Sequence, residues 1–143
     1  MNAPQVAVFF YGSYMNAAVL AQVGIVFDSF EVATLQGFDI EIGALANLVR
    51  SEGRQVYGLL TEATAAELER LYAHAADVLG GTYEPETVHV ECRDGTRKPA
   101  LCYIAAELPA RPAAPDYIER ILVPARQYGF PRWYVERLES FLP

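Results

Sequence analysis

The chain carries Phe9-Phe10-Tyr11-Gly12-Ser13-Tyr14-Met15 near its start, a glycine turn entered from an apolar run. The run from Val6 to Tyr11 is short and rich in Val and Phe, which is typical of a buried strand. Beyond the turn, Asn16 to Val23 is predicted to form a short helix. Because a strand, a glycine turn and a helix in this order direct main-chain N–H groups towards a ligand, we expect Tyr11 to Met15 to form a binding turn.

The middle of the chain is predicted to be β-structure. Phe30 to Ile42 ends with alternating apolar and acidic residues, and Gly37 within it indicates a bulge or a bend. Residues 46–49 and 55–60 are two further predicted strands. Ser51-Glu52-Gly53 between them is typical of a turn, so the sequence predicts a hairpin there.

The clearest helix is predicted from Thr64 to Leu79. Thr64-Ala65-Ala66-Glu67 has the pattern of a capping box, in which the hydroxyl and the carboxylate each accept a main-chain N–H. Gly80-Gly81 is expected to end the helix, because glycine adopts the left-handed conformation at little cost. The apolar residues form one stripe by their spacing: Leu68, Leu71, Tyr72, Ala75 and Leu79.

The last third of the chain predicts another hairpin and two helices. The hairpin joins residues 87–92 to 100–105 around Asp94-Gly95. A helix over residues 117–128 is expected to kink or break at Pro124, and a final helix covers residues 131–141. Because helices and strands do not alternate regularly, a doubly wound sheet is disfavoured. The predicted fold class is α+β, a small mixed, mostly antiparallel β-barrel with flanking helices, in a single domain over residues 1–143.

Composition narrows the function further. The 143 residues are 52% hydrophobic and 20% charged, with a net charge of −7 and a pI near 4.8. Such an acidic chain is predicted not to bind nucleic acid, whose phosphates it would repel. Cys92 and Cys102 are expected to be buried, reduced thiols. No apolar stretch reaches the length of a membrane span, and the start of the chain lacks the pattern of a signal peptide, so we expect no membrane partner and a cytoplasmic location.

Four segments in order resemble the gamma-glutamylcyclotransferase and AIG2-like family. They span nearly the whole chain. They are residues 9–15, residues 33–38 with 46–49 and 56–60, residues 67–71, and the stretch from Tyr117 through Tyr128-Gly129-Phe130-Pro131 to Tyr134.

The resemblance implies a reaction without a cofactor or a metal. The α-amine of a gamma-glutamyl amine or amide attacks its own γ-carbonyl, which gives 5-oxoproline and releases the amine. In the family, main-chain N–H groups of the glycine turn hold the glutamyl group, and a helix glutamate moves the proton. In this sequence the position of that glutamate is Ala75, and the asparagine of the family's turn is replaced by Tyr14.

The candidate site follows from these matches. His74 and Glu84 are the candidate catalytic residues, since each lies near the end of the same helix and carries an ionisable side chain. The candidate substrate-binding residues are Tyr11, Gly12, Ser13, Tyr14, Met15, Ala75, Tyr83 and Tyr117. No group of His, Cys or acidic residues has metal-ligand spacing, so no metal is expected.

Three functional hypotheses stay open at this point. The first is a gamma-glutamylcyclotransferase-like enzyme that acts on a small gamma-glutamyl ligand, as a monomer or a homodimer. The second is a non-catalytic module of the same fold that binds small carboxylates and has lost the catalytic glutamate. The third is a different transferase or hydrolase chemistry in the same pocket. An assay for 5-oxoproline separates the first from the other two.

Overall fold

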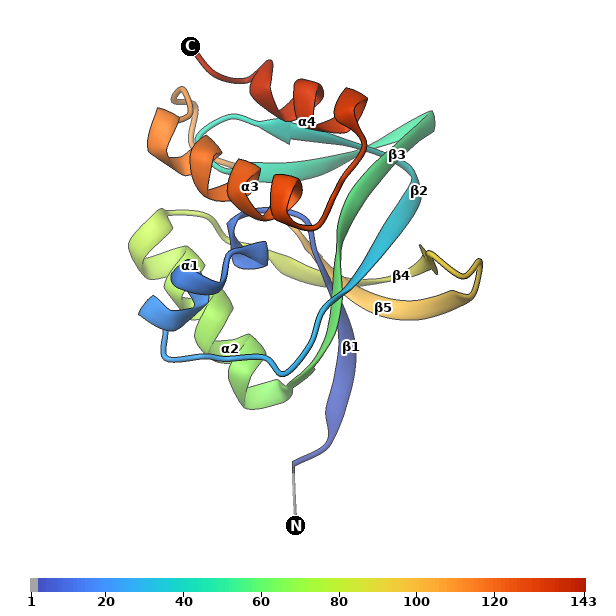
Figure 1. The fold of residues 1–143 in the computed structure, drawn as a ribbon. Coiled ribbons are helices and arrows are strands. Elements are labelled where there is room, and N and C mark those ends of the chain that lie inside the picture. The colour runs from blue at the N-terminus through green and yellow to red at the C-terminus, as the bar shows by residue number, and fades with distance from the viewer. Residues whose placement is uncertain (1–2) are drawn as a thin grey trace.

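Five strands form one sheet that curls into a ring (Figure 1). A computed structural model describes residues 3–143. The strand order is β1-β3-β2-β4-β5, and a parallel pairing of Val8 with Leu101 closes the ring between β1 and β5, whereas the other pairs are antiparallel. The predicted α+β class with a mostly antiparallel sheet is confirmed. The strands are β1 Gln5–Phe10, β2 Glu31–Ile42, β3 Ala46–Thr64, β4 Glu84–Cys92 and β5 Arg97–Ile104.

The strands β2 and β3 form one long hairpin that turns at residues 43–45. The predicted hairpin around Ser51-Glu52-Gly53 is wrong, because both halves of β3 pair with β2. The register shifts at Gly37, and both Gly37 and Gly53 have positive φ angles of 83° and 80°. Turn-forming residues therefore build a bulge here, and the bulge predicted at Gly37 is confirmed.

The helices lie outside the ring, with α3 and α4 together at one side and α1 beside α2 at another (Figure 1). The second predicted hairpin, around Asp94-Gly95, is confirmed as β4 and β5. The helical elements are a 3-10 turn at Ser13–Met15, α1 Ala17–Gln22, α2 Ala65–His74, a π turn at Ala75–Leu79, α3 Pro115–Gln127 and α4 Arg132–Glu139.

The capping box of α2 is confirmed. The N–H of Glu67 donates to the Thr64 hydroxyl at 3.1 Å, and the N–H of Thr64 donates to the Glu67 carboxylate at 2.9 Å. Gly80 ends the helical stretch with a left-handed φ of 85°, as expected. The last turn, Ala75–Leu79, is wider than an α-helix, and such π turns are frequent at functional sites.

The helix α3 continues through Pro124, so of the predicted kink or break the break is wrong. A proline inside a helix leaves the carbonyl four residues earlier without its usual donor. That carbonyl belongs to Arg120, and the side-chain amide of Asn16 donates to it at 2.9 Å. The side-chain oxygen of Asn16 also accepts the N–H of Ala18 at the start of α1. The Asn16 side chain therefore provides a hydrogen-bond partner both for the free carbonyl in α3 and for an N–H at the start of α1. It links the two helices at the end of the glycine turn.

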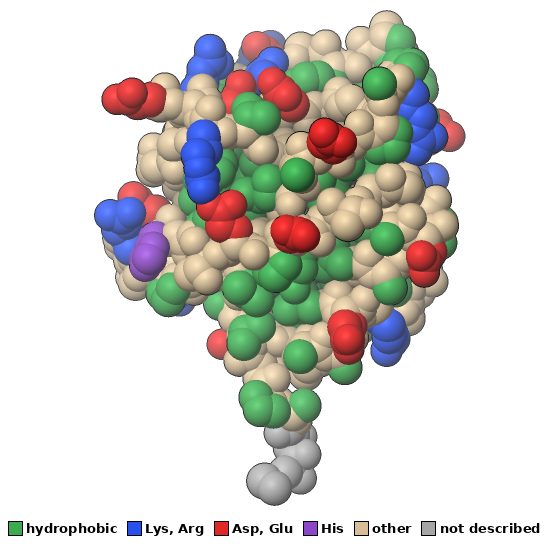
Figure 2. All heavy atoms as spheres, turned by 180° about the vertical axis from the view of Figure 1, so that it is seen from behind, with side chains coloured by type: hydrophobic (Ala, Val, Ile, Leu, Met, Phe, Trp, Pro, Cys, Tyr) green, Lys and Arg blue, Asp and Glu red, His purple; other side chains and the backbone are tan. Residues whose placement is uncertain are grey.

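The buried core of the described residues is apolar, apart from Ser13 and Thr61. Its largest fully buried side chains include Phe9, Phe10, Leu35, Leu59 and Ile121, and Cys92 and Cys102 are buried, free cysteines as predicted. Seen from behind, charged side chains are scattered over the surface and hydrophobic ones gather near its centre (Figure 2). Among residues 3–143, none of the helices has the length and apolar character that a membrane crossing requires.

Candidate functional site

A small pocket lies beside the glycine turn, between the start of β3 and the end of α2. The 3-10 turn is closed by the N–H of Met15, which donates to the Gly12 carbonyl at 3.1 Å. The cavity has a volume of about 40 Å³. Its walls are Phe10, Tyr11, Gly12, Ser13, Tyr14, Leu45, Ala46, Tyr72, Ala75, Leu79, Tyr83, Tyr103 and Tyr117.

Residues of the glycine turn line this pocket and bring their main-chain N–H groups to it. Within residues 3–143, no hydrogen bond from the N–H of Gly12, Ser13 or Tyr14 to another group is formed. The turn approaches β3 closely, since a Cβ at Gly12 would lie 3.2 Å from the Cβ of Ala46. Glycine therefore lets the main chain, and not a side chain, line this wall.

Tyrosine hydroxyls hold the pocket's walls together through main-chain groups. The hydroxyl of Tyr11 donates to the carbonyl of Tyr103 at 2.7 Å. The hydroxyl of Tyr83 donates to the carbonyl of Ala46. The N–H of Ala46 donates to the Tyr117 hydroxyl at 2.8 Å. The wall is thus assembled from the turn, β3, β5 and α3 by bonds that fix its shape.

Tyr14 makes a different set of contacts. Its hydroxyl lies 2.6 Å from the carbonyl of Leu71, to which it donates, and 2.9 Å from Nδ1 of His74. Tyr14 is 7% exposed, whereas His74 is half-buried at the surface of α2. Tyr14 is therefore the lining tyrosine whose hydroxyl contacts an ionisable side chain within the described residues.

Burial keeps the lining hydroxyls protonated. Burial is the main cause that raises the pKa of Tyr14, and the neighbouring Tyr117 raises it further. Burial likewise raises the pKa of Tyr11, Tyr83 and Tyr117. The walls contain no Asp, Glu, Lys, Arg or His among residues 3–143. At neutral pH the pocket is therefore uncharged, with polar atoms supplied by phenols and peptide groups.

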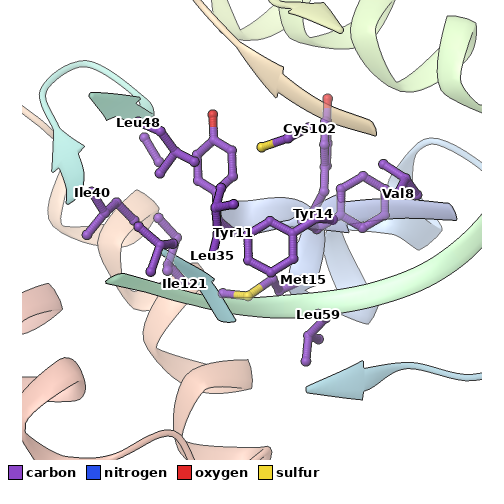
Figure 3. Close-up of a cluster of buried hydrophobic side chains, with 14 of the residues drawn as sticks. Val8, Tyr11, Tyr14, Met15, Leu35, Ile40, Leu48, Leu59, Cys102 and Ile121 are labelled. Atoms are coloured by element: carbon purple, nitrogen blue, oxygen red, sulfur yellow. The ribbon is translucent and has the colours of Figure 1, made fainter. Parts of the chain in front are cut away.

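The structure brings most of the predicted site residues together. Tyr11 and Tyr14 point to one side of the turn, whereas Met15 points to the other, towards Ile121 in the core (Figure 3). Glu84 is exposed at the start of β4 and does not line the pocket. His74 is also outside the lining and reaches it through Tyr14. The predicted residues that do line it are Tyr11, Gly12, Ser13, Tyr14, Ala75, Tyr83 and Tyr117.

Sequence reasoning missed two tyrosines of the wall, Tyr72 and Tyr103. The rings of Tyr72 and Tyr103 stack at a centroid distance of 3.7 Å with 11° between their planes. Tyr72 precedes Ala75 by three residues on the same helical stripe, which was a usable signal. The position of Tyr103 depends on the register of β5 and had no local signal.

The model of the family described as "Gamma-glutamyl cyclotransferase, AIG2-like" matches residues 8–122. The chain belongs to this gamma-glutamyl cyclotransferase, AIG2-like family. The match includes the glycine turn, the helix end at Ala75 and Tyr117, so all of the pocket's lining residues lie within the matched range.

Relatives in the gamma-glutamyl cyclotransferase family are distant in sequence. The mouse gamma-glutamylcyclotransferase is 24% identical over 124 residues, which cover 78% of this chain and 65% of the mouse protein. The human gamma-glutamylcyclotransferase is 25% identical over 126 residues, covering 80% of this chain and 66% of that protein. The chain therefore spans slightly less than two thirds of the length of these relatives.

Solved structures show that the family's fold is kept. A structure described as a gamma-glutamyl cyclotransferase superposes with a TM-score of 0.81 at 23% identity, over 98% of this chain and 89% of the other. An uncharacterized human protein gives a TM-score of 0.80 at 23% identity, over 97% and 89%.

Proposed function

We propose that this chain is a gamma-glutamylcyclotransferase-like enzyme that converts a gamma-glutamyl amine or amide to 5-oxoproline and releases the amine. The observation that carries the proposal is the pocket itself. It joins the unpaired main-chain N–H groups of Gly12 and Ser13 to the helix end at Ala75, within a chain of this family. Glu84 is not part of this proposal, because its exposed side chain lies outside the pocket.

The pocket has the parts that such a cyclisation needs. N–H groups without an acceptor at the turn stabilise a substrate carboxylate or a developing oxyanion. The attacking amine and the carbonyl belong to one molecule, so that orientation by the tyrosine walls lowers much of the barrier. An uncharged lining also favours the neutral form of the attacking amine.

The substrate has to enlarge the cavity when it enters. A volume of about 40 Å³ accommodates a few water molecules but not a glutamyl group. Tyr11, Tyr14 and Tyr117 are buried, and Tyr83 is held by its hydrogen bond to Ala46, whereas Tyr72 and Tyr103 are half-buried and stack on each other at the wall. We expect the half-buried tyrosines to act as the movable wall.

The direct test is the release of 5-oxoproline from gamma-glutamyl dipeptides and gamma-glutamyl amines. Gly12→Val places methyl groups against Ala46 and the pocket, and we expect it to lower kcat/KM at least about tenfold. Gly43→Val is the matched control, because a Cβ at Gly43 meets open space. A wild-type protein that gives no product from the whole panel would contradict the proposal.

A non-catalytic outcome is recognisable in the same experiment. A protein that releases no 5-oxoproline, yet shows a higher Tm with added 5-oxoproline, binds the ligand without cyclising its precursor. The single domain over residues 1–143, the monomeric or homodimeric state, the absence of a nucleic-acid partner and the cytoplasmic location stay predictions.

A further inference from the structure

The proposed reaction has to move a proton, and no lining side chain of the described pocket carries a carboxylate. The attacking amine must lose a proton, and the leaving nitrogen must gain one. We infer that Tyr14 and His74 form the proton relay of this pocket, with the Tyr14 hydroxyl meeting the substrate and His74 acting through it. This inference rests on the proposed function.

The geometry of the pair supports a relay. Tyr14 lines the pocket, and its hydroxyl lies 2.9 Å from Nδ1 of His74, which is within hydrogen-bond distance. His74 immediately precedes Ala75, which lines the same cavity. Histidine exchanges protons readily near neutral pH, whereas a buried phenol passes a proton without storing a charge. Tyr14 therefore transfers the proton and His74 stores it, whereas a single carboxylate would do both.

The hydroxyl can turn from one acceptor to the other. It donates to the carbonyl of Leu71 in this structure. That carbonyl also accepts the N–H of Ala75 within the helix. Because the Leu71 carbonyl keeps a partner when the hydroxyl rotates to His74, the rotation does not leave a buried acceptor unsatisfied.

The relay balances in two steps. In the first, the α-nitrogen forms its bond to the γ-carbonyl carbon, the C=O π pair moves to the oxygen, and the nitrogen passes a proton to the Tyr14 oxygen, while the hydroxyl proton of Tyr14 moves to the unprotonated Nδ1 of His74; the C=O bond re-forms in the second step. In the second, Nδ1 returns its proton to the Tyr14 oxygen, and Tyr14 gives its proton to the leaving nitrogen as the C–N bond breaks. One amide bond replaces another, and no oxidant or cofactor is consumed.

Three other hydroxyls of the pocket, and the nearby Cys102 thiol, are less suited to this role. The hydroxyls of Tyr11 and Tyr83 donate to main-chain carbonyls, and that of Tyr117 accepts a main-chain N–H. Cys102 lies in the core beside Tyr11, and burial, aided by Glu86, raises the pKa of its thiol to about 12. It therefore stays protonated at neutral pH.

Single substitutions test the pair. We expect Tyr14→Phe and His74→Gln each to lower kcat at least about 100-fold with little change in KM. Tyr128→Phe and His89→Gln are the matched controls, since Tyr128 is half-buried and His89 is exposed, both outside the pocket. If both Tyr14→Phe and His74→Gln keep kcat within about threefold of the wild type, the relay is wrong.

A bypass distinguishes catalysis from a structural role. Ala75→Glu places a carboxylate in the pocket, and in that background Tyr14→Phe should cost less than about fivefold in kcat, because the relay is no longer needed. If Tyr14→Phe instead acts through a structural defect, it should lower kcat by the same factor in the Ala75→Glu background as in the wild type. Because Ala75 is 2% exposed, Ala75→Glu can fail to fold, and His74→Ala with added imidazole is the second test. Activity that imidazole does not restore at least about tenfold contradicts a proton role for His74.

The hydrogen bond has a readout that does not need substrate. The chain has two histidines, so their ¹⁵N spectra are assigned by His89→Gln alone. Tyr14→Phe should shift Nδ1 of His74 and leave His89 unchanged, and an unchanged His74 signal would contradict the contact. An inactive wild type overturns the proposed function together with the relay, whereas an active wild type with unaffected Tyr14→Phe and His74→Gln overturns the relay alone.

Discussion

The two sides of the glycine turn are packed in opposite ways. On the Met15 side, buried apolar side chains such as Leu59 and Ile121 pack together (Figure 3). On the other side, six tyrosines surround a small cavity, and four of their hydroxyls bond to main-chain groups. The core side holds its shape by close packing, whereas the pocket side holds its shape by hydrogen bonds. The pocket side is therefore the one that can open.

Alkaline pH should weaken the core that adjoins the pocket, where Cys102 lies beside Tyr11. Burial raises the pKa of Cys102 from 9.0 to about 12. As pH rises, the unfolded chain loses this proton first, so the contribution of Cys102 to stability is unchanged below pH 9 and falls by on the order of 4 kcal/mol between pH 9 and 12.

Urea unfolding at pH 8, 9, 10 and 11 measures this loss. Cys102→Ala should flatten the decline between pH 9 and 11, although the variant starts from a lower stability because it leaves a small cavity. The buried tyrosines add to the decline at higher pH in both proteins. If the free energy of unfolding declines equally with pH in the two proteins, ionisation of the Cys102 thiol does not cause the decline.

A single methyl group should disrupt the core side. A Cβ at Gly58 would lie 2.4 Å from the carbonyl oxygen of Phe10 and 2.5 Å from the ring of Phe9. Both neighbours belong to β1, which is held in place within the sheet. We therefore expect Gly58→Ala to lower the free energy of unfolding by about 3 kcal/mol. Gly43→Ala is the control in open space, and chemical denaturation compares the two. A loss below about 1 kcal/mol would contradict this prediction, because Phe9 and the main chain of Phe10 would then have moved aside at little cost.

Removing one hydroxyl from the pocket side should have a smaller effect. Tyr11→Phe keeps the ring and deletes the hydrogen bond to the Tyr103 carbonyl. The expected loss is about 1.5 kcal/mol, since a buried acceptor is left without its donor. Tyr128→Phe, outside the pocket, should change thermal stability by much less. If both variants melt together, hydrogen bonds do not hold this wall.

Local features of the fold were predictable from sequence, but partners across the sheet were not. The capping box at Thr64 and the end at Gly80 depend on a few neighbouring residues and are found as expected. Ser51-Glu52-Gly53 has the same local chemistry in a turn and in a bulge, and the choice depends on pairing with β2. The prediction of a break at Pro124 was wrong for a similar reason. The hydrogen-bond donor that compensates for the proline comes from Asn16, which is distant in the sequence.

The same limit applies to the site. Family resemblance indicated the turn, Ala75, Tyr83 and Tyr117, and the structure gathers all of them around one cavity. The contact between Tyr14 and His74 joins residues 60 positions apart. The sequence indicated His74 only as an ionisable residue near the end of the helix, and it could not show that a tyrosine from the turn reaches it there.

Ala46 is attached at both of its peptide groups, to Tyr117 through its N–H and to Tyr83 through its carbonyl. Neither bond uses the methyl group, so the identity of this residue carries little information about the attachment. An evolutionary survey of the pocket should therefore follow the paired occurrence of tyrosine at positions 83 and 117. Loss of one phenol would release one anchor of the strand's first residue, and covariation of the two would show that they act as a unit.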